Sequence, residues 1–219
     1  MNPASDRSGA PSLKVEATMT EQTHAFQNWA KERIDEMDAA LASLEPKAKQ
    51  AQAEAKAKAD QLVSDLNQRR DQFRSKVEEL ARAGESALQA SKAQLETQWN
   101  GFESQIKTYF ETVGHQMEQQ QATFRDVAAA QAKAWRETVD SIHEEVKKRA
   151  AAGRSDVDAV LKQMKSNAEQ AEARLQKLKQ AGGESWGALS AALSESRKAF
   201  DRANQEAWDA LRRAAPPQA

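Results

Sequence analysis

Residues 95–117, LETQWNGFESQIKTYFETVGHQM, carry the pattern that decides the fold. Large apolar side chains recur at steps of three and four residues, which places them on one face of an α-helix. Polar residues fill the positions between them, and no run alternates every second residue as a half-buried strand would. Because such a face is unstable in water, another helix, a second copy of the chain or a lipid-like surface must cover it. The face consists of Leu95, Trp99, Phe102, Ile106, Tyr109 or Phe110, Val113 and Met117.

The same spacing recurs along most of the 219 residues. Only 8 Gly and 5 Pro are available to interrupt the helices. We therefore predict an all-α fold of four to six long amphipathic helices. These helices either fold back into an antiparallel bundle or run as an extended coiled coil. Helix-breaking residues place the expected interruptions near Pro46, Gly84, Gly114, Gly153 and Gly182.

The ends of the chain differ in composition from its middle. Residues 1–20 are mostly small and polar and predict a flexible N-terminal tail, and residues 214–219 predict a short C-terminal tail. Residues 21–213 form the amphipathic helical region. Within it, the segment 47–60, KAKQAQAEAKAKAD, is rich in helix-forming residues and poor in bulky ones. It predicts either a solvent-exposed helix or a seam of small residues where two helices approach closely.

The two halves of the chain are similar when one is shifted by 98 residues. Phe26 then falls on Phe124, and Phe102 falls on Phe200. An internal duplication explains this match, but so does a shared heptad pattern, because the shift is a multiple of seven. The two units of such a duplication would span residues 24–113 and 122–211.

The charge and composition of the chain exclude several classes of function. The chain has 32 basic and 33 acidic side chains and a net charge of -1, so no basic field indicates nucleic acid or an anionic membrane as a partner. It has no cysteine, no transmembrane segment and no secretory signal, which makes the cytoplasm the expected compartment. Ala supplies much of the hydrophobic content, so the core should be thin and the molecule elongated.

No catalytic motif is present, and we predict a protein that is not an enzyme and needs no cofactor. Two acid-x-x-His spacings occur, from Glu21 to His24 and from Asp140 to His143. Di-iron bundles use similar spacings, but they require further inward-facing acids from other helices. We interpret these histidines as solvated surface residues, with no metal site.

The five tryptophans are more informative. Indole is too bulky for regular coiled-coil packing, but it suits a boundary with one apolar and one wet side. The alternative is that the rings fill gaps between helices of a bundle. The predicted contacts with a hydrophobic surface or a partner are Trp29, Trp99, Phe102, Ile106, Trp135, Trp186, Phe200 and Trp208.

The segment 177–208, KLKQAGGESWGALSAALSESRKAFDRANQEAW, resembles bacterial apolipoprotein-like, coiled-coil helical proteins. The shared feature is a Gly-acid-x-Trp start of a last amphipathic helix, here Gly183 to Trp186. The middle and C-terminal parts are also similar to phasins, the helical proteins that coat polyhydroxyalkanoate granules. The resemblance implies an amphipathic protein that binds lipid or granules and self-associates. The alternative is a coiled-coil scaffold that contacts only other proteins.

Overall fold

The computed structural model describes residues 11–83, 85–113, 117–148, 154–181 and 186–214, which are helical except for a reversal at residues 50–52. The prediction of an all-α fold is confirmed, since these ranges contain six helices and no strand. The helices are α1 (Pro11–Lys49), α2 (Ala53–Ala83), α3 (Glu85–Val113), α4 (Met117–Lys148), α5 (Arg154–Ala181) and α6 (Trp186–Ala214).

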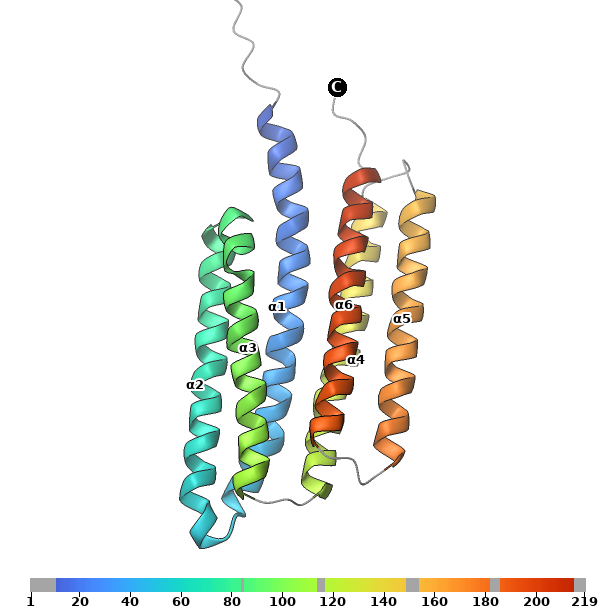
Figure 1. Ribbon diagram of the computed structural model, residues 1–219. Helices are drawn as coiled ribbons and strands as arrows, with labels where there is room; N and C mark the ends of the chain where they lie inside the picture. Colours follow the sequence, from blue (N-terminus) through green and yellow to red (C-terminus); the bar gives the residue numbers. More distant parts are fainter. Residues whose placement is uncertain (1–10, 84, 114–116, 149–153, 182–185, 215–219) are drawn as a thin grey trace, which may run out of the picture.

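The helices lie side by side as an antiparallel bundle, in which each helix runs opposite to the one before it (Figure 1). α1, α2 and α3 pack on one another, and so do α4, α5 and α6. We call these two groups the first and second trio. The trios meet mainly along α1 and α4, and α6 makes further contacts with α1 and α3. The bundle is therefore held together across a long interface between two similar units.

The apolar face predicted in residues 95–117 is covered by helices of the same chain. Trp99 and Phe102 are buried in the main core cluster together with side chains of α1, α2, α4 and α6. Met117 is an exception, because α3 ends at Val113 and Met117 begins α4, where it is 43% exposed. The prediction that Met117 continues the same face was wrong, since the face ends where the helix does.

Two other boundaries differ from the sequence prediction. α1 begins at Pro11, so the helix includes residues 11–20 that we expected in the tail; residues 1–10 lie outside the described part. Proline suits the first helical position, where its missing N–H needs no partner. α1 also continues past Pro46 to Lys49, and the Gln50 amide still donates to the Pro46 carbonyl at 3.2 Å. The chain then reverses inside the Ala-rich segment, where most of the described residues are exposed and Ala48 and Ala59 are buried.

One pair of helix bounds repeats with the offset of 98 residues found in the sequence. A shift of 98 residues carries the end of α2 at Ala83 onto the end of α5 at Ala181. Phe102 and Phe200 are both fully buried. Both of these helix ends adjoin residues outside the described part of the chain, and the duplication stays a prediction. The expected breaks at Gly84, Gly114, Gly153 and Gly182 lie outside the described residues, between consecutive helices.

Candidate functional site: buried tryptophans around an ionic layer

All eight predicted contact residues lie inside the bundle. The five tryptophans and Phe102, Ile106 and Phe200 are buried between helices of the same chain. Among the described residues, Met117 is the only large apolar side chain that is exposed. In the closed bundle these rings therefore fill gaps between helices, and contact with an outside surface would require the helices to separate. Their role as contact residues stays a prediction.

The indole N–H groups of the five tryptophans share an unusual feature. Within the described part of the chain, none of these buried N–H groups has a hydrogen-bond acceptor. A buried polar group without a partner costs about 1–3 kcal/mol relative to its hydrated state. Tryptophan usually finds an acceptor when it is buried. In the closed bundle the indole rings are therefore in apolar surroundings, while their N–H groups have no hydrogen-bond acceptor among the described residues.

A layer of charged and polar side chains crosses the bundle where the trios meet, and we call it the ionic layer. Its most deeply buried charged members are Glu32 and Glu36, which are 0% and 1% exposed. Charged side chains are seldom buried so completely unless they are paired. The ionic layer consists of Glu32, Arg33 and Glu36 of α1, Glu103 of α3, Gln131 of α4, and Arg197 and Asp201 of α6.

Arg197 is the centre of one half of the ionic layer. Its Nε donates to Glu36 Oε2 at 3.1 Å, and its Nη2 donates to Glu103 Oε1 at 2.7 Å. Gln131 Nε2 donates to the other Glu36 oxygen at 2.9 Å and to the Leu193 carbonyl at 3.1 Å. One carboxylate of α1 thus contacts both α4 and α6, which fixes the position of α1 against the second trio.

Arg33 is the centre of the other half. Its two terminal nitrogens donate to the two oxygens of Asp201, at 3.0 and 2.7 Å, in the paired geometry that favours Arg–carboxylate contacts. Arg33 also forms an ion pair with its neighbour Glu32. Within the described residues, Arg33 Nε and Glu32 Oε1 have no partner, so this half of the layer is incompletely satisfied.

Burial dominates the electrostatics of the ionic layer. It raises the pKa of Glu36 well above the usual range, and the Glu32 charge acts in the same direction against the opposing effect of Arg197. Burial alone would lower the pKa of Arg33, but Glu32 and Asp201 outweigh it and raise that pKa. Both arginines therefore stay charged, while Glu36 binds a proton more readily than an exposed glutamate does.

The ionic layer is joined to the tryptophans by cation–π contacts. The Arg33 Cζ atom lies 5.2 Å from the centre of the Trp29 ring, and the Arg197 Cζ atom lies 4.8 Å from that of Trp99. Such contacts are strongest where water is excluded. A movement that separates the trios would therefore expose the charges and these two indoles together.

Sequence reasoning missed the ionic layer, although a signal was present. Glu32 and Glu36 follow Trp29 at steps of three and four residues, which places them on the buried face of the same helix. Charged residues at such positions are normally assigned to solvent. The spacing alone was enough to identify them as candidates for a buried polar layer.

The histidines singled out in the sequence do not meet. The His24 ring stacks on Trp208 with 5.0 Å between ring centres, and His143 is exposed on α4. Among the described side chains, no three acids or histidines gather closely enough to hold a metal ion. Nor do the described helices include one with the length and low polarity needed to cross a bilayer.

No family model matches the chain, and comparison with curated proteins and with solved structures finds no significant match.

Proposed function

We propose that this chain is a non-enzymatic amphipathic protein whose bundle opens so that its buried aromatic faces bind a hydrophobic surface. The surface is a lipid layer or a polyhydroxyalkanoate granule in the cytoplasm. The observation that carries this proposal is the set of five buried indoles without acceptors. At a boundary between an apolar phase and water, each ring stays in apolar surroundings while its N–H reaches water.

The ionic layer supports the same proposal. A buried ion pair stabilises a fold less than well-packed apolar residues of similar volume usually do. Its charges become hydrated once α1 separates from α4 and α6, so the charged groups gain solvation when the bundle opens. This gain in solvation offsets part of the cost of separating the trios.

Self-association follows from the same opening. The closed bundle offers no large apolar patch among its described residues, since Met117 is the only exposed large apolar side chain there. Opened trios would present their apolar faces both to the surface and to neighbouring copies. We therefore propose that oligomers form on the surface and not between closed bundles.

A scaffold that contacts only proteins is the second candidate. It is favoured by the near absence of exposed apolar side chains from the described surface, because a permanently closed bundle would offer partners a polar exterior. The two candidates differ in whether the tryptophans ever leave the core.

Brominated phosphatidylcholine vesicles distinguish the candidates, because bromine on the acyl chains quenches indole fluorescence on contact. Neutral vesicles also exclude docking by charge alone. Surface binding predicts quenching by these vesicles or sedimentation of the protein with polyhydroxyalkanoate granules. Unchanged fluorescence, no sedimentation and concentration-dependent oligomers in light scattering would favour the scaffold.

A further inference from the structure

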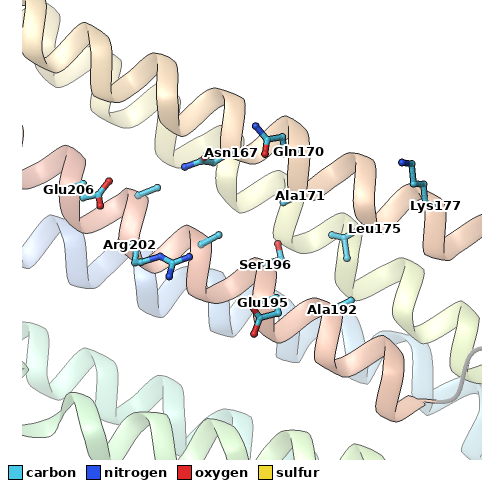
Figure 2. A pocket seen from close by; sticks show the side chains of 12 residues that line it. Asn167, Gln170, Ala171, Leu175, Lys177, Ala192, Glu195, Ser196, Arg202 and Glu206 are labelled. Atoms are coloured by element: carbon cyan, nitrogen blue, oxygen red, sulfur yellow. The ribbon is translucent and has the colours of Figure 1, made fainter.

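A groove of about 610 Å³ runs between α5 and α6 (Figure 2). This volume is in the range of small-molecule sites in proteins. The part of α6 from Ala192 to Glu206 lines it, a span of about 21 Å at the rise of an α-helix. The groove is therefore long enough to take a linear ligand. Its apolar lining consists of Ala171, Leu175, Ala192, Ala199 and Ala203.

At two of the positions that line the groove, the second trio has shorter side chains than the first. With the offset of 98 residues, Ala171 corresponds to Phe73 and Ala203 corresponds to Gln105. Phe73 is fully buried, and Arg69 of α2 donates to Gln105 of α3 at 2.6 Å. The first trio thus joins its helices with long side chains where the second trio has alanine. Helix packing alone does not account for the space.

Ser196 places an unsatisfied hydroxyl in this groove. The residue is 7% exposed and lines the groove, and its Oγ has no hydrogen-bond partner in the described part of the chain. Figure 2 shows the hydroxyl directed from α6 toward α5. Buried hydroxyls are nearly always hydrogen-bonded. A ligand in the groove that accepts a hydrogen bond would satisfy this group.

Arg202 adds a positive charge to the lining of the same groove. It lines the groove, and none of the acids in the described ranges forms an ion pair with it. Helical side chains point toward the N-terminus of their helix, and Figure 2 shows Arg202 extending along α6 in the direction of Ser196. Of the two acids at the rim, Glu195 pairs with Lys198 at 3.0 Å, while Glu206 follows Arg202 by one turn.

We propose that the groove between α5 and α6 binds a single-chain fatty acid. Arg202 and Ser196 both donate hydrogen bonds, so together they select a head group that only accepts them, as a carboxylate does. The alkyl chain lies on the alanine surface toward Leu175 and Ala192. The groove is present in the closed bundle, so this site does not depend on the opening proposed above.

Titration of the intact protein with dodecanoate labelled with ¹³C at the carboxyl carbon, below its micelle concentration, tests this site. We expect one saturable site, a shifted carboxyl resonance and binding weakened about tenfold in Arg202→Met and in Ser196→Ala. Ala171→Phe introduces the residue found at the equivalent position 73 of the first trio. It should abolish binding, because the phenylalanine ring fills the groove. Glu206→Gln should tighten binding, because it removes the negative charge beside the head group.

Two other ligands test whether the groove selects a carboxylate head group. Dodecanol and dodecyltrimethylammonium carry the same chain with a neutral and a cationic head, and both should bind at least about tenfold more weakly than dodecanoate. Equal binding of the three, absent binding of dodecanoate, or undiminished binding to Ala171→Phe would overturn the proposal. If circular dichroism shows that Ala171→Phe does not fold, Ala203→Gln provides the same test from α6. Failure here would leave quenching by brominated vesicles unaffected, which separates this site from the proposed opening.

Discussion

Arg197 of α6 contacts Glu36 of α1 across the interface between the trios, with 3.1 Å between its Nε and the carboxylate Oε2. The same guanidinium lies over the ring of Trp99 of α3. A single side chain of the second trio therefore contacts a buried acid and a buried indole of the first. This relationship links the charge state of the core to the position of the tryptophans.

Replacing Arg197 with methionine should destabilise the bundle strongly. The change keeps an unbranched apolar stem but removes the guanidinium that pairs with Glu36 and Glu103. Removal of one member of a buried ion pair costs about 3–5 kcal/mol, and we expect a loss of this size in the free energy of unfolding in urea. The neighbouring Lys198→Met variant is the control, because Lys198 forms an exposed pair with Glu195 and should show no measurable change. Equal stability of the two variants would contradict a structural role for the ionic layer.

Glu36→Gln should flatten the dependence of stability on pH. Because the folded-state pKa of Glu36 is raised above 4.5, the folded chain holds a proton that the unfolded chain releases. This contribution is complete below the unfolded pKa and is lost as the pH rises through the folded pKa. Glutamine imitates the protonated side chain, so the stability of the variant relative to the wild type should increase as the pH rises above 4.5.

Thermal unfolding followed by circular dichroism over that pH range measures the difference. The melting temperature of the wild type is subtracted from that of Glu36→Gln at each pH. The difference removes the contributions of the acids that both proteins share. We expect a gap in melting temperature that widens as the pH rises. Parallel curves would show that Glu36 does not hold a proton in the folded bundle.

α5 should be the least protected helix in hydrogen exchange. It contains no aromatic residue, and it is flanked by the groove against α6 and by a second groove of about 370 Å³ against α4. Few buried contacts imply easy local opening. Exchange measured by mass spectrometry should be faster in residues 157–178 than in the central parts of α1 and α4. Equal protection of α5 and α1 would show that the grooves do not weaken the helix.

The helical fold and much of the core could be predicted from spacing alone. Trp99 and Phe102 repeat with the period of a helix, and no strand pattern competes with them. The exact ends were less predictable, because Pro46 weakens the helix only locally and α1 continues for three more residues. Local propensity does not determine where tertiary packing ends a helix.

The spacing could indicate Glu32 and Glu36 as buried candidates, but the partners they meet could not be predicted, for a physical reason. The burial of Glu36 depends on Gln131 and Arg197, which come from distant parts of the chain and meet it only after the trios pack. The groove likewise depends on side-chain length at Ala171 and Ala203, which matters only once α5 lies against α6. Periodicity identifies a buried face, but not which face it will meet.

A disulfide between α1 and α4 tests the central claim that the trios separate. Ser43 Oγ and Thr123 Oγ1 lie 3.0 Å apart, and the chain has no cysteine of its own. The double variant Ser43→Cys/Thr123→Cys should therefore form a bond that joins the trios, verified by mobility on a non-reducing gel. Each single variant, treated with the same oxidant, is the control for the substitutions themselves.

The decisive measurement is quenching of tryptophan fluorescence by brominated phosphatidylcholine vesicles, and sedimentation with polyhydroxyalkanoate granules, before and after reduction of this disulfide. We predict that the oxidised double variant binds neither surface and that reduction restores binding to at least one of them. Binding by the oxidised protein as strong as by the reduced protein would contradict opening between α1 and α4.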